Sequence, residues 1–113
     1  MRITFETKDD IAILKISGRM IFDETLFLLR SYVRNALQSG VLRFVIDISD
    51  VPYLDSSGCG EMISTYISIA KANGSMALLN PAERVRILLT RIRLTEILKI
   101  FDTLDEAQEF VRL

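Results

Sequence analysis

The sequence predicts an α/β fold: one domain over residues 1–113, with a mixed, mostly parallel sheet of about five strands, an N-terminal hairpin and about four packed helices. The chain has 113 residues, of which 50% are hydrophobic. That length can bury one real core but not two. Two β-rich runs open the chain and meet at Asp9-Asp10, which suits a tight turn. Apolar runs then alternate with helical stripes, the pattern of parallel strands joined by helices.

The first third of the chain predicts the hairpin and one helix. Ile3–Thr7 alternates apolar and polar residues, and Ile11–Ile16 is a second β-rich run that Gly18 ends. Asp23 is the expected N-cap of the following helix, and Gly40 its C-terminal stop. The apolar stripe of this helix recurs at spacings of three and four residues and consists of Leu26, Leu29, Val33, Ala36 and Leu37.

A central strand and the longest helix come next. Leu42–Ile48 is nearly all apolar, which is typical of a strand covered on both faces. Pro52 cannot donate to a sheet ladder, so the strand ends before it. The helix that follows is expected to end at Asn73-Gly74, and its inward stripe is Cys59, Met62, Ile63, Tyr66, Ile69 and Ala70.

The next unit is a short apolar strand, Ser75–Leu79, followed by a helix start. Asn80 is predicted to cap this helix, with Pro81 at its first position and Glu83 closing a capping box. The inward stripe is expected to be Val85, Leu88, Leu89 and Ile92. The opposite face is basic and is interpreted as solvated; it carries Arg84, Arg86, Arg91 and Arg93.

The chain finishes with a last strand and helix. Leu94–Leu98 leads into a short strand near Lys99–Phe101. Thr103–Glu106 opens the final helix, whose inward residues are predicted to be Leu104, Ala107 and Val111. We find no linker, internal repeat or low-complexity segment.

Composition excludes several classes of function. The net charge of −1, with no basic stripe, argues against nucleic-acid binding. No apolar run approaches the roughly 18 residues that a membrane span needs, so no membrane insertion is expected. The first residues enter a strand pattern directly, unlike a signal peptide. A single cysteine allows no intrachain disulfide, and we expect a cytoplasmic protein.

The chain contains no histidine, which removes the Ser-His-Asp and Cys-His constellations and the commonest metal ligand. Cys59 has no partner for a zinc site, and no phosphate-binding P-loop is present. We therefore predict no enzymatic activity, no catalytic residues, no metal and no cofactor.

The main candidate functional residues lie between the central strand and the long helix, at Asp55-Ser56-Ser57-Gly58. All four residues are good N-cap types, so two hydroxyls lie at a helix N-terminus. In open α/β sheets this edge is where ligands and partners usually meet the fold. Taken alone, this pattern is interpreted as a helix cap and nothing more.

The stretch from Asp50 to Gly60 reads DVPYLDSSGCG and resembles the D-x-x-[FY]-[ML]-D-S-S-G-x-G signature of STAS domains, most closely the bacterial anti-sigma factor antagonists. The resemblance covers nearly the whole chain, because element order and length agree as well. It implies that Ser56, the first serine after the aspartate, is phosphorylated, with Ser57 as second choice. The residues it implies for partner binding are Asp23, Asp55, Ser56, Ser57, Gly58, Cys59 and Gly60.

The resemblance further implies partner switching. The unmodified protein would bind an anti-sigma factor, which is a GHKL-type serine kinase, and so release a sigma factor. The kinase would phosphorylate Ser56 and let go, and a PP2C-type phosphatase would restore the serine. Relatives often carry Gly-x-Leu-Asp after the second strand. This chain has Gly18-Arg19-Met20-Ile21, with Asp23 displaced by two residues, which bears on the choice of partner.

Several residues near this site have two interpretations. Asp23 is either a partner contact or an ordinary helix cap. Phe22 and Phe27 are either contact surface or core, and core is the commoner fate of phenylalanine. Cys59 has a lowered pKa at the helix start, or is a small core residue.

Two rival functions remain. The first is a STAS scaffold without phosphorylation, as a subunit of a transporter or a stressosome-like complex; neighbouring transporter genes rather than a kinase gene would favour it. The second is a small nucleotide-binding or nucleotide-hydrolysing protein, which the missing P-loop disfavours and a nucleotide titration would detect.

Overall fold

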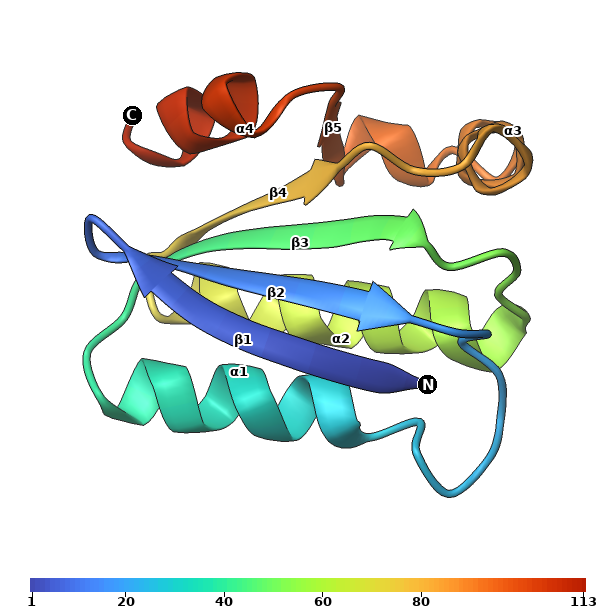
Figure 1. Ribbon diagram of the computed structural model, residues 1–113, viewed down its shortest axis with the longest axis horizontal. Helices are drawn as coiled ribbons and strands as arrows, with labels where there is room; N and C mark the ends of the chain where they lie inside the picture. Colours follow the sequence, from blue (N-terminus) through green and yellow to red (C-terminus); the bar gives the residue numbers. More distant parts are fainter.

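The computed structural model describes residues 1–113 and contains one five-stranded sheet in the order β1-β2-β3-β4-β5 (Figure 1). Only β1 and β2 run antiparallel; each later strand is parallel to its neighbour. The strands are β1 (Arg2–Lys8), β2 (Ile11–Ser17), β3 (Arg43–Asp50), β4 (Ser75–Leu79) and β5 (Lys99–Phe101). The predicted mixed sheet with an N-terminal hairpin is confirmed. Asp9 and Asp10 both have positive φ, 52° and 67°, as a tight hairpin turn requires.

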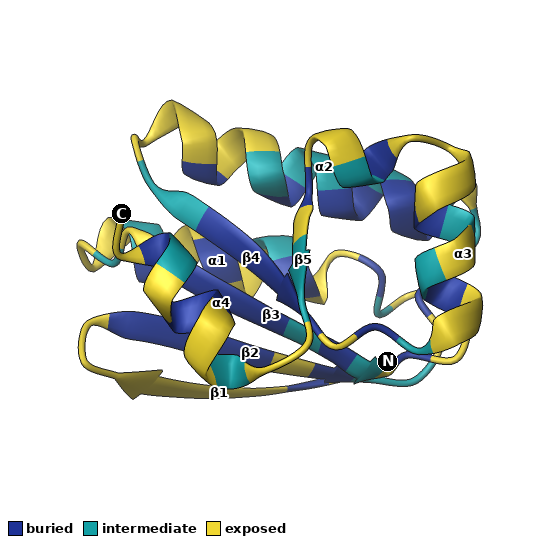
Figure 2. Cartoon of the chain, turned by 90° about the horizontal axis from the view of Figure 1, so that it is seen from above, coloured by how far each residue is buried: buried dark blue, intermediate teal, exposed yellow.

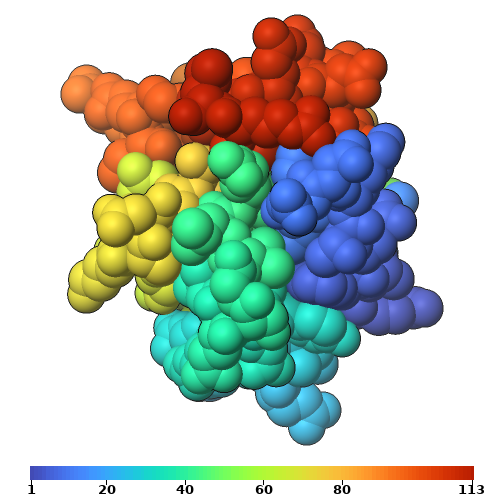
Figure 3. All heavy atoms as spheres, turned by 90° about the vertical axis from the view of Figure 1, so that its left-hand side faces the viewer, coloured from blue at the N-terminus to red at the C-terminus, as the bar shows by residue number.

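Helices cover both faces of the sheet. The structure contains α1 (Leu28–Gln38), α2 (Ser56–Lys71), α3 (Glu83–Arg91), α4 (Leu104–Val111) and a 3-10 turn at Leu94–Glu96. In Figure 1, α1 and α2 lie side by side under the sheet and α4 lies above it. Figure 3 shows the same layering from the side, with the red C-terminal segment opposite the teal and green of α1. No helix has both the length and the apolar composition that crossing a membrane requires.

Two apolar clusters hold the layers together. The larger contains 22 buried residues and packs the sheet against α1, α2 and α3, with Leu14, Phe44 and Ile46 at the sheet side. The smaller contains 7 buried residues and packs α4 onto the other face. Figure 2 shows β2, β3 and β4 largely buried and β1 largely exposed. The central strand thus has apolar neighbours on both sides, as its sequence predicts.

Several predicted boundaries are confirmed by local geometry. Gly40 has a φ of 92° directly after the C-cap of α1, and Asn73 has a φ of 63° after the C-cap of α2. Left-handed residues at this position are the usual way to end a helix. Thr103 caps α4: its Oγ1 accepts a hydrogen bond from the backbone N–H of Glu106 at 3.2 Å. The Thr103 hydroxyl also donates to the Glu106 carboxylate at 3.0 Å.

The predicted cap at Asp23 is wrong. α1 begins only at Leu28, and its N-cap residue, Phe27, makes no side-chain cap bond. Asp23 instead closes a local turn, in which its Oδ1 accepts from the Thr25 backbone N–H at 2.8 Å and from the Thr25 hydroxyl at 2.6 Å. The Asp23 carboxylate thus accepts hydrogen bonds from residue 25 instead of capping a helix. Aspartate side chains commonly bond the backbone two residues further on in this way.

The predicted capping box at Asn80 is also wrong. α3 begins at Glu83 after Ala82, with no side-chain cap, so Pro81 lies before the helix rather than at its first position. Asn80 has a φ of 50°, and its N–H donates to the Phe101 carbonyl at 2.7 Å. The backbone of Asn80 therefore bonds to β5, and its positive φ differs from the extended conformation of a helix N-cap.

Two predicted stripe residues point outward. Ile92 is 45% exposed because α3 ends at Arg91 and the chain turns away. Ala70 is exposed, whereas Glu61 and Thr65 of the same helix are buried. α2 therefore presents to α1 and the sheet a face that includes two polar residues, which a purely apolar stripe cannot identify.

Candidate functional site

Two loops extend the β2–β3 pairing beyond the strand ends. They are the β2–α1 loop (18–27) and the β3–α2 loop (51–55). The N–H of Gly18 donates to the Asp50 carbonyl at 3.0 Å, and that of Met20 donates to the Tyr53 carbonyl, also at 3.0 Å. The N–H of Asp55 donates back to the Met20 carbonyl at 3.1 Å. The two loops are thus bonded into one unit at the carboxyl edge of the sheet.

Asp55 caps α2 and also joins the two loops. Its Oδ1 accepts from the Gly58 N–H at 2.9 Å, which makes Asp55 the N-cap among the four candidate residues 55–58. Its Oδ2 accepts from the Phe22 N–H at 3.1 Å, across the gap between the loops. The bond from Gly58 is the largest cause that lowers the pKa of this carboxyl, and the bond from Phe22 acts in the same direction. The carboxylate therefore remains ionised and holds the helix start in place.

Gly58 permits the close contact between the loops. It is buried, and a Cβ atom at this position would lie 2.1 Å from the Met20 carbonyl oxygen. The same oxygen accepts the hydrogen bond of Asp55, so it cannot move away without breaking the site. Gly60, one residue further on, has nothing within 4 Å of its own Cβ position. Only Gly58 of this pair is required by packing.

The two serines differ in exposure. Ser56 is the first residue of α2 and is exposed, whereas Ser57 is half-buried. The hydroxyls of both serines are free of hydrogen bonds to other protein groups, since Asp55 alone provides the cap. Ser56 therefore presents an unengaged hydroxyl at a helix N-terminus, where backbone N–H groups and the helix dipole favour negative charge.

The structure also shows the surroundings of Cys59 and Asp23, two further residues predicted to bind a partner. Cys59 is buried, and burial, followed by the nearby Asp55 charge, raises the pKa of its thiol. Of its two interpretations, the structure supports the small core residue. Asp23 is exposed and lies next to Phe22, which the Asp55 carboxylate binds. Its pKa is lowered, chiefly by the Thr25 hydroxyl, so Asp23 adds a negative charge beside the β3–α2 loop.

The β2–α1 loop exposes aromatic surface. Phe22 is 75% and Phe27 is 52% exposed, so the prediction that core burial is their commoner fate is wrong for both. The Arg30 guanidinium lies 5.3 Å from the centre of the Phe27 ring. Phe22 and Phe27 both belong to the β2–α1 loop, whereas Arg30 lies in the first turn of α1.

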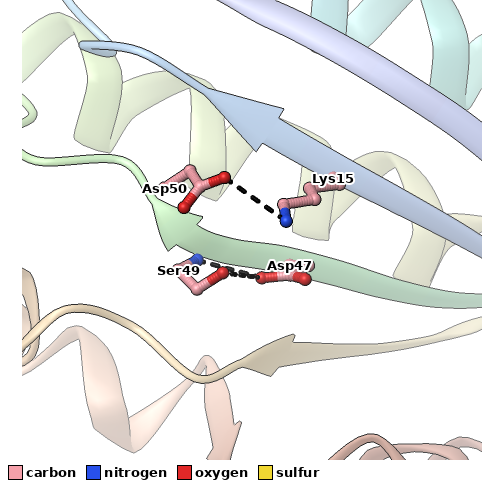
Figure 4. A network of polar contacts seen from close by, with 4 residues as sticks. All are labelled: Lys15, Asp47, Ser49 and Asp50. Carbon is pink, nitrogen blue, oxygen red and sulfur yellow. Dashed lines mark hydrogen bonds and ion pairs between the residues drawn. The ribbon is translucent and has the colours of Figure 1, made fainter.

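A polar network at the end of β3 is not among the predicted site residues. Figure 4 shows Asp47 accepting from Ser49 through both the backbone N–H, at 3.0 Å, and the hydroxyl, at 2.8 Å. Lys15 of β2 lies 3.3 Å from the Asp50 carboxylate. The signal in the sequence is the alternation of Asp47 and Ser49 within an otherwise apolar run. This alternation places Asp47 and Ser49 on the face of the sheet that α4 covers, together with Val45.

The fold is that of a STAS domain. The sequence profile of the STAS domain family matches residues 2–107, and the chain belongs to that family.

Similarity to known proteins extends over almost the whole chain. The chain is 32% identical over 109 residues to a Thermotoga maritima protein named "putative anti-sigma factor antagonist", and the match covers 96% of both proteins. The crystal structure of a Thermotoga maritima protein of the same description superposes with a TM-score of 0.88 at 31% identity, covering 98% of this chain and 95% of that one. Unphosphorylated SpoIIAA, an anti-sigma factor antagonist, shares the fold with a TM-score of 0.75 at 20% identity, over 98% of each chain.

Proposed function

We propose that this protein is an anti-sigma factor antagonist that switches partners through phosphorylation of Ser56. The observation that carries the proposal is the exposed and unbonded Ser56 hydroxyl at the start of α2, beside two loops that Asp55 holds together. In its unmodified state the protein binds a GHKL-type anti-sigma kinase and thereby frees a sigma factor. A PP2C-type phosphatase reverses the modification. The protein is then a substrate and a binding module in the cytoplasm rather than an enzyme.

The chemistry of the site suits such a switch. A phosphate on Ser56 adds about −1.5 to −2 charges at neutral pH. The helix N-terminus tolerates that charge, so the fold changes little. A partner surface that fits a neutral hydroxyl must instead desolvate or repel the phosphate. Asp23 and Asp55 contribute negative charge to this surface, while Arg19 and the N-terminal ammonium contribute positive charge near Asp23, so a phosphate on Ser56 makes the surface markedly more negative.

The exposed aromatic residues support a role in protein binding. Phe22 and Phe27 stand on the loop that is bonded to the β3–α2 loop, so they are available to the same partner. Aromatic side chains, phenylalanine among them, are enriched at the cores of protein–protein interfaces. We include them with Asp23, Asp55, Ser56, Ser57 and Gly60 in the proposed contact surface, while Gly58 and Cys59 are buried behind it.

The direct experiment is incubation with a GHKL-type kinase encoded beside the gene and with ATP, followed by intact and peptide mass spectrometry. We expect one added phosphate on Ser56. Ser56→Ala should abolish it, remain bound to the kinase in the presence of ATP, and lose at most about 1 kcal/mol of stability. If Ser56→Ala is phosphorylated to the same extent, the site is wrong and Ser57→Ala becomes the informative variant.

Ser56→Asp tests whether charge drives release. A carboxylate provides one charge and two oxygens, so it imitates part of a phosphate. We expect the thermal midpoint to remain near wild type while affinity for the kinase falls about tenfold, equivalent to about 1.4 kcal/mol. Calorimetric titration with Ser57→Asp as the matched control checks this. Binding as tight as wild type would favour the alternative, a STAS scaffold in a transporter or stressosome-like complex that assembles without phosphorylation.

A further inference from the structure

A groove lies between α3 and the β3–α2 loop, on the same end of the molecule as the proposed switch (Figure 1). Its volume is about 250 Å³. Val85 and Leu54 line it and are buried, whereas Tyr53 and Ile87 line it and are each 46% exposed. Ser56 does not line it. We call this surface the α3 groove.

Two arginines flank the apolar part of the α3 groove. Arg84 and Arg91 both line it, both are exposed, and both lie outside the four ion pairs of the structure. They are seven residues apart on one helix, which corresponds to about 10.5 Å along its axis. Ile87 lies between them at a spacing of three and four residues, on the same face. The groove therefore presents an apolar centre between two positive charges.

The size of the α3 groove favours part of a protein over a small molecule. Its volume of about 250 Å³ is below the roughly 300–1,000 Å³ typical of small-molecule pockets. It is sufficient for side chains that project from a docked helix. Apolar grooves beside a helix commonly bind the apolar face of a second, amphipathic helix through residues at i, i+3, i+4 and i+7.

We propose that the α3 groove binds an acidic amphipathic helix of a partner protein. The complementary helix carries acidic residues seven positions apart and two apolar residues between them, at i+3 and i+4. The acidic side chains pair with Arg84 and Arg91, whose planar guanidinium groups suit carboxylates. The apolar side chains contact Ile87 and Tyr53. This surface is additional to the proposed Ser56 switch, and its occupancy does not require phosphorylation.

The probe is a synthetic, fluorescein-labelled helical peptide with glutamates at positions i and i+7 and leucines at i+3 and i+4. A scrambled peptide of identical composition, with these residues spread around the helix, is its control. Fluorescence anisotropy should show binding of the patterned peptide and much weaker binding of the scrambled one. Because exposed ion pairs are screened by salt, we expect affinity to fall between 0.05 and about 0.5 M salt.

Protein variants locate the peptide. Arg84→Gln/Arg91→Gln should weaken binding about fivefold, as expected for the loss of two exposed ion pairs. Arg34→Gln/Arg93→Gln removes the same charge from exposed arginines outside the groove and should bind nearly as well as wild type. Circular dichroism checks that both variants fold. Ser56→Asp should also bind the peptide, which separates this result from any failure of the switch.

Three results would overturn the proposal: no binding of the patterned peptide, equal binding of the scrambled peptide, or equal loss in the two double variants. Sedimentation of the wild-type protein adds a fourth. If the protein alone self-associates, and Arg84→Gln/Arg91→Gln abolishes that self-association, the occupant of the groove is a second copy of the chain rather than a partner helix.

Discussion

At the scale of single residues, Gly58 and Gly60 show how similar positions in one helix can have opposite requirements. Both belong to the first turns of α2. The space for a Cβ at Gly58 is taken by the Met20 carbonyl, whereas the space at Gly60 is open. The backbone oxygen that crowds Gly58 also accepts the Asp55 N–H. Gly58 is therefore part of the site because of a loop 38 residues earlier in the sequence.

We expect Gly58→Ala to destabilise the protein by about 2 kcal/mol or more. A contact of 2.1 Å with a backbone atom cannot be relieved by a rotamer change, and overpacking typically costs ~1–3 kcal/mol. Gly60→Ala is the matched control and should be neutral or more stable by about 0.5–1 kcal/mol, because alanine is the better helix former. Urea unfolding measures both. Equal stabilities of the two variants would contradict the close contact.

The ionisation of Asp55 should make the stability of the fold depend on pH, with a definite sign. Its pKa is lowered in the folded protein, so its carboxylate stabilises the fold above the ordinary aspartate pKa of about 4. That contribution is lost as the pH falls through the lowered value. The difference in thermal midpoint between wild type and Asp55→Asn should therefore be constant from pH 5 to 8 and shrink below about pH 4.

Asp105→Asn is the control for this pH series. It makes the same charge change at an exposed aspartate of α4 that has no capping role. A midpoint difference for Asp55→Asn that stays constant down to about pH 2 would show that ionisation of Asp55 does not stabilise the loops.

At the scale of elements, α1 and α2 are joined by an ion pair within their apolar contact. Arg30 of α1 pairs with Glu61 of α2, whose side chain is only 3% exposed. Glu61 Oε2, Arg30 Nε and the Thr65 hydroxyl are buried without a protein hydrogen-bond partner. Arg30 also lies over the ring of Phe27. The ion pair therefore connects α2, which follows the β3–α2 loop, to an exposed aromatic residue of the β2–α1 loop.

We expect Arg30→Met to lower stability by about 2 kcal/mol, because it leaves the Glu61 carboxylate buried and unpaired. Breaking a fully buried pair costs ~3–5 kcal/mol, and the partial exposure of Arg30 reduces this value. Arg30→Met/Glu61→Met removes both charges and should recover most of the loss. Chemical denaturation of the two variants decides the matter: a double variant no more stable than Arg30→Met would refute a specific pairing.

At the scale of the whole molecule, the two faces of the sheet have unequal cores. The cluster against α1, α2 and α3 contains 22 buried residues, and the cluster under α4 contains 7. Local opening follows the apolar surface that each element buries. α4, which packs only on the smaller cluster, should therefore open at a lower free energy than β3, which has apolar residues in both clusters and remains closed until global unfolding.

Hydrogen exchange measures this difference. We expect the amides of α4 to exchange through local opening at a lower free energy than those of β3. Val111→Ala, in the smaller cluster, should speed exchange mainly in α4. Leu29→Ala, fully buried in the larger cluster, should lower global stability by about 2–5 kcal/mol and speed exchange of β3 as well. Equal protection of α4 and β3 in the wild-type protein would refute the unequal cores.

The order of strands and helices and the opening hairpin can be predicted from the sequence, which also places a helix cap among residues 55–58. Each depends on residues close together in the chain: apolar periodicity, turn-forming residues, and a run of N-cap residue types. The conformation of Asn80, whose N–H donates to the Phe101 carbonyl, and the burial of Glu61 against Arg30 follow only from the tertiary structure. The requirement for glycine at position 58 has the same origin, because the Met20 carbonyl occupies the space of a Cβ atom. These outcomes depend on partners from distant segments of the chain, which local caps and apolar stripes do not identify.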